Sequence, residues 1–241
     1  PVLRQLFHVV ADPGQLRRLR LDEVLDWTGD ALNRVVRDDF FRSFDQNLAV
    51  QYFYEPFLEA FDPELRKRLG VWYTPPEIVE YMVERVDTVL RTELGLADGL
   101  ADRRVRILDP ACGTGAYLVG VLERIARTLR EKGDDALLAA DLKRAATERV
   151  FGFEILPASF VVAHLQLGLI LRNHDAPLDA ETHERAAVYL TNALTDWDED
   201  DEASPLPFPE LQREREAAER VKREEEILVV IGNPPYDGYA G

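Results

Sequence analysis

The sequence predicts an α/β fold with a parallel sheet, preceded by an α-helical segment. From residue 70 onward, strand patterns alternate with helix patterns, which is the order typical of a parallel sheet. Residues 1–69 instead carry apolar residues at three- and four-residue spacings. With 241 residues, 46% of them hydrophobic, the chain is long enough to bury a sizeable core. We therefore expect a helical segment over residues 1–69 and an α/β domain over residues 70–241.

Local patterns predict each element of the α/β domain. Thr74-Pro75-Pro76-Glu77 has the spacing of a capping box, so a helix is expected to begin there and to end at Gly95. Apolar residues at helical spacing are predicted to line one face of this helix: Ile78, Met82, Val86 and Leu90. Further helices are expected at 116–130, 135–149, 158–172 and 210–226, and four strands at 105–108, 150–155, 187–190 and 227–231. The last strand is continuously apolar, as in a sheet covered on both faces.

Composition excludes several classes of protein. No stretch approaches the ~18 uninterrupted apolar residues of a membrane span, and the first ten residues lack the pattern of a secretory signal. The single cysteine, Cys112, excludes a disulfide framework and an all-cysteine zinc site. His8, His174 and His183 show no metal-ligand spacing, and His164 lies in an apolar helix, where a satisfied core histidine is expected. We expect a cytoplasmic protein with no metal site.

The net charge of −16 gives the chain no general attraction to nucleic acid. The 13 acidic and 5 basic residues between positions 196 and 226 account for half of that charge. A surface for DNA must therefore be local, or it must lie outside this chain.

The strongest local signal is DPACGTG at residues 109–115, directly after the first expected strand. Glycines let the backbone approach a ligand closely, and this turn is where open α/β sheets bind nucleotides. Position 118 is leucine and no Gly-Lys-Ser/Thr follows, so neither a dinucleotide fingerprint nor a phosphate loop is present. Asp109 would repel a pyrophosphate and favours a cationic ligand, such as S-adenosylmethionine. The alternative for the glycines alone is an ordinary turn.

Two further motifs follow later strands. Glu154 ends the second strand, where a carboxylate can accept both hydroxyls of a ribose; considered alone, it would be a surface acid. Asn233-Pro234-Pro235-Tyr236 follows the fourth strand, and its prolines make the backbone rigid. The Asn233 side-chain oxygen and the Pro234 carbonyl could hold an amino group, and Tyr236 could stack on a planar base. The alternative is a proline-rich turn with a packed tyrosine.

Asp-Pro-Ala-Cys-Gly-Thr-Gly followed by Asn-Pro-Pro-Tyr resembles the amino-group DNA methyltransferases, specifically the adenine-modifying class. VWYTPP at residues 71–76 looks like the additional cofactor motif of that family, placed upstream as in the gamma arrangement. Further stretches resemble the methyltransferase portion of single-chain type I (type ISP-like) restriction-modification enzymes: 54–58, 62–67, 152–154, 163–165 and 188–192. The matches run from about residue 52 to residue 236.

This resemblance implies a Rossmann-like, S-adenosylmethionine-dependent methyltransferase sheet. It also implies a site-specific DNA adenine N6-methyltransferase of a restriction-modification or phage-defence system, which acts on a flipped adenine. The cofactor pocket would be formed by Thr74, Asp109, Ala111, Cys112, Gly113, Gly115, Glu154, Ile155 and Asn192. The catalytic residues would be Asn233, Pro234, Pro235 and Tyr236. Cys112 is expected to be a small loop residue rather than a nucleophile. Asn192 stands where many relatives have an aspartate that binds the cofactor adenine.

Two alternatives remain open from the sequence. A methyltransferase acting on a glutamine side chain or on ribosomal RNA can also carry Asn-Pro-Pro-Tyr, although the upstream Trp-Tyr-Thr-Pro element argues against it. A non-catalytic cofactor-binding fragment or subunit is the second. Only five residues follow Tyr236, so we expect the sheet to be incomplete at the C-terminus, with no target-recognition domain and little activity in this chain alone. The open edge of the strand at 227–231 is a candidate surface for a partner chain.

Overall fold

The computed structural model describes residues 13–18, 21–34, 36, 74–133, 135–179, 181–182, 184–194 and 209–234. Before the α/β domain, two helices are described, α2 (Pro13–Arg18) and α3 (Leu21–Asn33), in agreement with the helical pattern of this segment. Apart from residues 34 and 36, the other positions of the expected segment over residues 1–69 lie outside the described residues. None of the described helices is long and apolar enough to cross a membrane.

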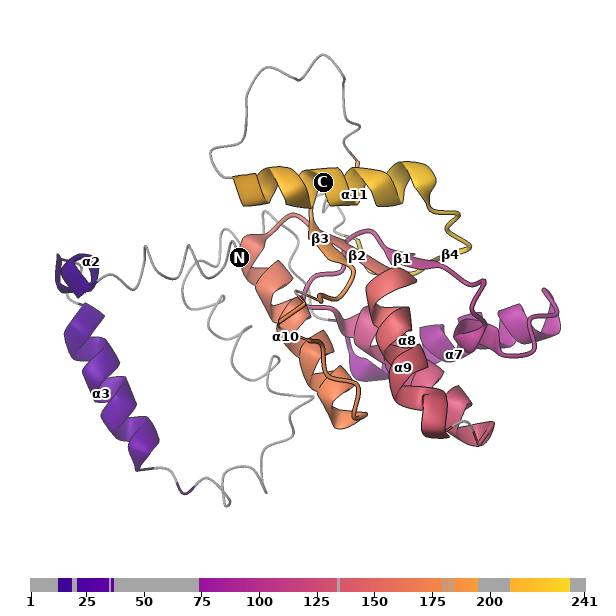
Figure 1. Cartoon of the computed structure of the whole chain (residues 1–241), viewed down its shortest axis with the longest axis horizontal. Coiled ribbons are helices and arrows are strands. Elements are labelled where there is room, and N and C mark those ends of the chain that lie inside the picture. The colour runs from indigo at the N-terminus through magenta and orange to yellow at the C-terminus, as the bar shows by residue number, and fades with distance from the viewer. Residues whose placement is uncertain are drawn as a thin grey trace, which may run out of the picture.

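The centre of the α/β domain is a parallel sheet of four strands (Figure 1). The strands are β1 (Ile107–Asp109), β2 (Val150–Glu154), β3 (Val188–Leu190) and β4 (Val229–Val230), in the order β3-β2-β1-β4. Each neighbouring pair is parallel, which confirms the predicted sheet, although β4 is shorter than expected. The chain leaves β1 toward β2 and β3 and then returns to the other side of β1. The junction between β1 and β4 is therefore the topological switch point, where α/β sheets bind ligands.

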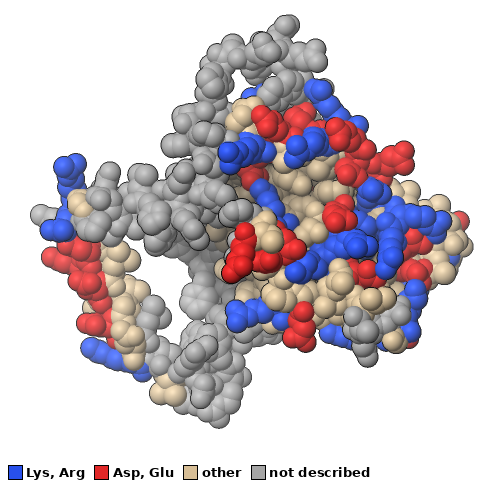
Figure 2. Space-filling model, in the orientation of Figure 1, with Lys and Arg blue, Asp and Glu red and all other residues tan. Residues whose placement is uncertain are grey.

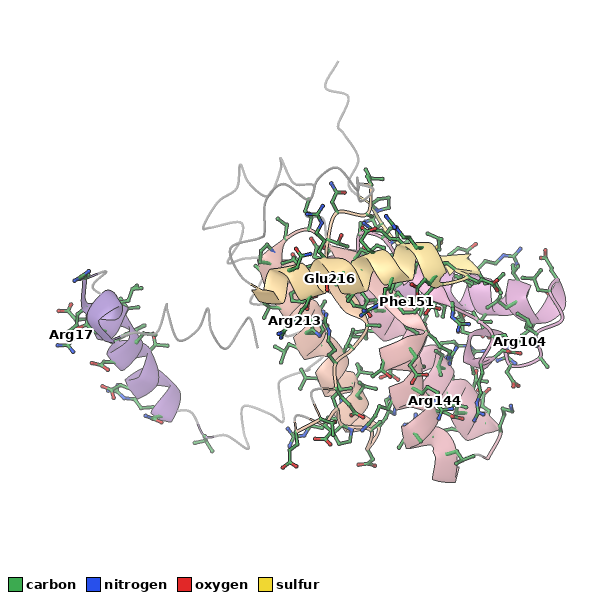
Figure 3. All side chains as sticks on the ribbon, turned by 45° about the horizontal axis from the view of Figure 1, so that its top comes forward. Arg17, Arg104, Arg144, Phe151, Arg213 and Glu216 are labelled. Carbon is green, nitrogen blue, oxygen red and sulfur yellow. The ribbon has the colours of Figure 1, made fainter. Side chains whose placement is uncertain are left out.

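Helices cover both faces of this sheet (Figure 1). The helices of the domain are α7 (Pro76–Thr92), the short 3-10 helix η2 (Gly99–Ala101), α8 (Ala116–Glu131), α9 (Asp135–Glu148), α10 (Pro157–Asn173) and α11 (Pro209–Glu224). The large core lies between the sheet and α7 to α10, and α11 closes the opposite face. Ala218 and Val221 of α11 pack with Phe151 of β2, whereas Arg213 and Glu216 lie on its exposed side (Figure 3).

The capping box predicted for α7 does not form. The helix begins at Pro76 with Pro75 as its N-cap, and no side chain makes a capping hydrogen bond. The Pro75 carbonyl accepts the backbone N–H groups of Ile78 and Val79, and two consecutive prolines remove two of the donors that a cap would satisfy. The Thr74 hydroxyl is therefore left for another partner.

The buried face of α7 also differs from the predicted face. Val79, Val83, Asp87 and Leu90 are buried. Of the predicted residues, Leu90 is buried and Val86 is half-buried against the core, but Ile78 is 49% exposed and Met82 is 37% exposed. Both sets of residues have helical spacing, so periodicity alone could not distinguish them.

A buried carboxylate decides the orientation of α7. Asp87 is 1% exposed and accepts hydrogen bonds from Arg91 (2.8 Å), Arg124 of α8 (2.7 Å) and the Leu100 backbone N–H (2.8 Å). Burial opposes ionisation, but these donors together hold the pKa of Asp87 below its usual value. The network fixes α7 against α8 and so determines where Thr74 lies, just before the helix.

Candidate active site

The polar residues predicted from the sequence converge at one edge of the sheet. Asp109 ends β1, Glu154 ends β2, Asn192 follows β3 and Asn233 follows β4. Because all four strands are parallel, their carboxyl ends meet at this edge, on both sides of the switch point. Pro234 is described and exposed, whereas Pro235 and Tyr236 lie outside the described residues.

The turn after β1 has the left-handed conformations that glycine permits. Gly113 has a φ of +56° and Gly115 a φ of +92°, and α8 starts directly after Gly115. A Cβ on Gly115 would lie 3.3 Å from the Cβ of Ala163 on α10, so the turn packs closely against that helix. A Cβ on Gly113 would meet no atom within 4 Å. The turn is thus supported at Gly115 and open at Gly113, as a ligand cradle requires.

Asp109 is a buried carboxylate, 1% exposed, and accepts the Ala111 backbone N–H at 3.1 Å. Burial raises the pKa of Asp109 to about 7, the Ala111 N–H opposes this rise, and the negative charge of Glu154 adds to it. No lysine or arginine of the described part of the chain contributes to its pKa. A cationic ligand would supply the neighbouring positive charge that is missing around the Asp109 carboxyl group.

Glu154 connects β2 to the glycine turn. Glu154 is 7% exposed and its carboxylate accepts the Leu156 backbone N–H at 2.7 Å, while the backbone amides of Gly113 and Ile155 also favour its charged form. Burial raises the pKa of Glu154 although these donors oppose the shift. Ile155, also predicted to line the pocket, is 58% exposed.

Cys112 lies in the interior of the turn. It is 5% exposed, its backbone N–H donates to the Phe153 carbonyl at 2.9 Å, and a Cβ on Gly152 would lie 3.0 Å from its sulfur. Burial raises the pKa of the Cys112 thiol, and the charges of Asp109 and Glu154 raise it further. A neutral, buried thiol is a packing residue rather than a nucleophile, as the sequence predicted.

Asn192 lies close to Glu154, because the backbone N–H of the preceding residue, Thr191, donates to the Glu154 backbone carbonyl at 2.9 Å. The Asn192 side-chain oxygen accepts the Leu194 N–H at 2.9 Å, and its backbone carbonyl accepts a hydrogen bond from Lys222 of α11 at 3.0 Å. Its amide oxygen thus holds the turn after β3, and a role toward adenine remains a prediction.

Asn233 and Thr74 are joined directly. The Asn233 side-chain amide donates to the Thr74 hydroxyl oxygen, with 3.3 Å between Nδ2 and Oγ1. The structure therefore brings together a residue predicted for the cofactor pocket and a residue predicted for catalysis.

Gln166 of α10 is a residue that the sequence analysis did not select. Its side-chain amide donates to the Thr114 carbonyl at 2.6 Å and so holds the glycine turn from beneath. A polar residue within the apolar helix was the available signal. Two positions earlier on α10, His164 faces the Val188 carbonyl at 3.2 Å, and burial followed by the charge of Arg185 lowers its pKa to about 4. His164 is thus a neutral, half-buried histidine with a backbone partner, which agrees with the predicted satisfied histidine although it lies at the margin of the core.

Arginines on the surface of the domain are largely paired with acids of the same chain. The pairs include Arg103 with Asp141 (2.9 Å) and Arg104 with Asp102 (2.7 Å). Basic and acidic side chains are accordingly mixed on the face shown in Figure 2.

Residues 47–239 match the N-6 DNA Methylase family. The chain belongs to the N-6 DNA methylase family. Among the curated relatives, the adenine-specific methyltransferase PglX of Streptomyces coelicolor is 25% identical over 193 residues. That alignment covers 71% of this chain and 15% of the relative, so this N-6 DNA methylase chain spans only a small share of the relative's length.

Two solved structures have the same fold as this N-6 DNA methylase chain. The ATP-dependent type ISP restriction-modification enzyme LlaBIII bound to DNA is 25% identical, with a TM-score of 0.62, covering 79% of this chain and 12% of that one. The DrdV–DNA complex is 27% identical, with a TM-score of 0.60, covering 80% of this chain and 16% of that one. These similarities confirm the predicted resemblance to type ISP restriction-modification enzymes, and membership of the family implies a methyl donor.

Proposed function

We propose that this chain is the catalytic part of a site-specific DNA adenine N6-methyltransferase of a restriction-modification or phage-defence system. The observation that carries this proposal is the convergence of Asp109, Glu154 and Asn233 at the carboxyl edge of a parallel sheet, in a member of the N-6 DNA methylase family. We also propose that residues 70–241 form its methyltransferase domain and residues 1–69 a helical, coupler-like segment.

S-adenosylmethionine is the methyl donor that best fits the residues of this edge. The buried, raised-pKa carboxyl of Asp109 suits a ligand with positive charge, and the open position at Gly113 lets the backbone come close to it. Glu154 would turn toward the ribose, and Ala111, Cys112, Gly115, Ile155 and Asn192 would complete the pocket. When bound, the cofactor would supply an electrophilic methyl group on its sulfonium.

Asn233 and Pro234 would hold the target amine. The Asn233 side-chain oxygen and the Pro234 carbonyl would each accept a hydrogen bond from the exocyclic amine of adenine, which orients the nitrogen electron pair toward the methyl carbon. That electron pair would form the new N–C bond while the bond between the methyl carbon and the sulfonium sulfur breaks, with its electrons remaining on sulfur, and the surplus proton would leave the nitrogen for water after the attack. No strong base is needed, so catalysis here consists of positioning and hydrogen-bond polarisation.

DNA is the proposed substrate because both structural neighbours named above are bound to DNA. The target adenine must leave the double helix to reach Asn233, and Tyr236 would stack on it. With a net charge of −16, this chain would depend on a target-recognition domain elsewhere for its affinity and sequence choice.

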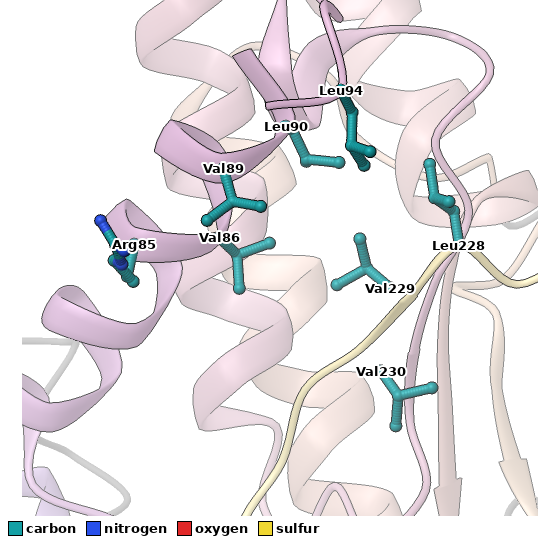
Figure 4. A pocket seen from close by; sticks show the side chains of 8 residues that line it. All are labelled: Arg85, Val86, Val89, Leu90, Leu94, Leu228, Val229 and Val230. Atoms are coloured by element: carbon teal, nitrogen blue, oxygen red, sulfur yellow. The ribbon is translucent and has the colours of Figure 1, made fainter. Parts of the chain in front are cut away.

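We further propose that another polypeptide segment with a β-strand covers the free edge of β4. Among the described residues β4 pairs only with β1, and Val230 is 67% exposed. An apolar groove of about 270 Å³ separates β4 from α7, where Val86, Leu90 and Leu94 face Leu228 and Val229 (Figure 4). Val230→Lys should reduce association through this edge, as measured by light scattering. Unchanged association would argue against this role.

The test of the proposed function uses the protein encoded by the complete reading frame and a labelled methyl donor. The donor is offered with mixed-sequence DNA, with ribosomal RNA and with protein, and the labelled position is identified by mass spectrometry. We expect N6-methyladenine within a defined DNA sequence. Label on RNA or on a glutamine side chain would replace this proposal with the alternative, and cofactor binding without transfer to any substrate would indicate a non-catalytic subunit.

A further inference from the structure

The hydrogen bond between Asn233 and Thr74 connects two loops that are 159 positions apart in the sequence. Thr74 directly precedes α7, and Asn233 follows β4 at the switch point of the sheet. We propose that Thr74 is a positioning residue, which holds the Asn233 side-chain amide in place for methyl transfer. This inference rests on the proposed function of Asn233 toward the target amine.

The Thr74 hydroxyl is available for this role because it does not cap the helix that follows. Pro75 is the N-cap, no side chain makes a capping hydrogen bond, and the Pro75 carbonyl accepts the N–H groups of Ile78 at 3.0 Å and Val79 at 3.1 Å. Pro75 and Pro76 carry no N–H that could attract the hydroxyl. The contact with Asn233 thus takes the place of the expected capping interaction.

The amide of Asn233 has two different ends, and the NH₂ end is the one that faces Thr74. An asparagine side chain carries an NH₂ donor and a carbonyl acceptor. When the Nδ2 group donates to the Thr74 oxygen, the Oδ1 atom points away from Thr74 and stays available as an acceptor. Methyl transfer to an amine needs this acceptor, since the amine must donate to it.

Thr74 is well placed to fix a neighbour because α7 itself is held firmly. Val79 and Val83 pack against Gly120 of α8, where a Cβ would lie 2.7 Å from a Val79 methyl group. The buried Asp87 network adds a second connection to α8. Asn233, in contrast, is exposed, so loss of the hydroxyl would leave its side chain free to adopt other rotamers.

Two substitutions at Thr74 separate the hydroxyl from the shape of the side chain. Thr74→Val keeps the shape and removes the hydroxyl, and Thr74→Ser keeps the hydroxyl. Single-turnover transfer and S-adenosylhomocysteine binding are measured with the protein encoded by the complete reading frame. We expect Thr74→Val to slow transfer roughly 10- to 100-fold, the scale of a misplaced reacting group. Cofactor-product affinity should stay within about twofold, because valine keeps the shape with which Thr74 would line the pocket and the lost hydroxyl is the group that contacts Asn233. Thr74→Ser should restore most of the rate.

Two controls exclude a merely structural explanation. Glu77→Ala removes the other half of the predicted capping box, and it should leave the transfer rate unchanged because no such cap forms. In the Asn233→Ala background, Thr74→Val should cause no further loss, since a positioning residue acts only through its partner. Additive losses in the double variant would overturn the inference. If Thr74→Val lost affinity for S-adenosylhomocysteine while its single-turnover rate stayed unchanged, the inference would be overturned as well.

A measurement on the 241-residue chain tests the contact independently of activity. The side-chain amide signals of Asn233, assigned by ¹⁵N NMR, should shift and exchange faster with water in Thr74→Val but not in Thr74→Ser. Unchanged signals in Thr74→Val would overturn the inference even if the wild type methylates adenine. Absence of adenine methylation by the wild type, with the expected change in the signals, would instead count against the proposed function alone.

Discussion

Asp109, at the end of β1, lies directly against the backbone of Gly232, the residue before Asn233. A Cβ built on Gly232 would be 2.5 Å from the Asp109 Oδ1 atom and 3.1 Å from its Cγ atom. The predicted cofactor carboxylate and the predicted catalytic loop therefore share one contact across the switch point. A change in the backbone at the end of β1 would therefore displace the backbone that follows β4, and the reverse also holds.

This contact predicts the effect of Gly232→Ala. The added methyl group would collide with a carboxylate that is 1% exposed and held by the Ala111 N–H. We expect a loss of about 1–3 kcal/mol in the free energy of unfolding, as for overpacking of a core, together with weaker cofactor binding. Urea denaturation and calorimetry measure the two effects.

The matched control is Gly168→Ala on α10. A Cβ there would meet no atom within 4 Å, so alanine should stabilise the helix by up to ~1 kcal/mol. Equal stability of the Gly232→Ala variant and the wild type would mean that Asp109 can move away freely.

The sequence predicted the sheet well because its signals are local. Four short apolar runs, each followed by a polar or glycine-containing turn, specified β1 to β4, and the parallel sheet brought their ends together. The buried position of Cys112 agrees with its expected role as a small loop residue, since a small side chain in a glycine turn has few other roles.

The errors arose where tertiary contacts choose between equivalent local patterns. Two apolar series on α7 had helical spacing, and the buried ion network of Asp87 with Arg124 decided between them. The Thr74 hydroxyl could cap a helix or bind a distant residue, and Asn233 is a partner that no local pattern reveals. Gln166 was missed for a similar reason, because its partner is a backbone carbonyl 52 positions away.

Gln166→Leu should weaken cofactor binding by loosening the glycine turn. The substitution removes the 2.6 Å hydrogen bond to the Thr114 carbonyl and keeps the apolar bulk of the side chain. A net hydrogen-bond contribution of ~1 kcal/mol corresponds to about fivefold in affinity. Leu165→Ala, at the neighbouring position that is 59% exposed, is the control and should bind normally. Normal calorimetric affinity in Gln166→Leu would mean that Ala163 alone supports the turn.

Stability should depend on pH through Asp109. Burial raises its pKa to about 7 from an unfolded value near 3.8, so the folded protein favours the neutral acid. This favourable contribution is fully present below about pH 4 and is lost as the pH rises through 7. Asp109→Asn cannot ionise, so the stability of this variant relative to the wild type should be higher at pH 8 than at pH 5. Denaturant unfolding at both pH values gives the difference, and a difference that does not change with pH would show that Asp109 is ionised throughout.

Gly113→Val should abolish cofactor binding at a moderate cost in stability. Valine at a φ of +56° costs about 1–3 kcal/mol, and its side chain would occupy the open space above the turn. Gly133→Val is the matched control, because Gly133 also has a positive φ (+75°) and no atom within 4 Å of a Cβ. Both variants should lose similar stability, but only Gly113→Val should lose affinity for S-adenosylhomocysteine. Equal affinity in both would place the pocket elsewhere.

Asn233→Ala should abolish methyl transfer and leave cofactor binding nearly intact. The side chain is exposed at the switch point, and the one contact described for it, the hydrogen bond to Thr74, adds little to the core. Its loss should therefore hardly change the free energy of unfolding. In the proposed mechanism Asn233 acts on the target amine, so its removal affects the transition state and not the binding of the methyl donor. Loss of one preorganised polar contact to a reacting group costs about 10²–10³ in rate, and we expect at least that reduction in single-turnover transfer.

The measurement compares the transfer rate and the S-adenosylhomocysteine affinity of Asn233→Ala with those of the wild type, in the protein encoded by the complete reading frame. Asn233→Asp is a companion variant, because it keeps an acceptor oxygen but cannot donate a hydrogen bond to Thr74. Near-normal adenine methylation by Asn233→Ala would exclude Asn233 from the reaction.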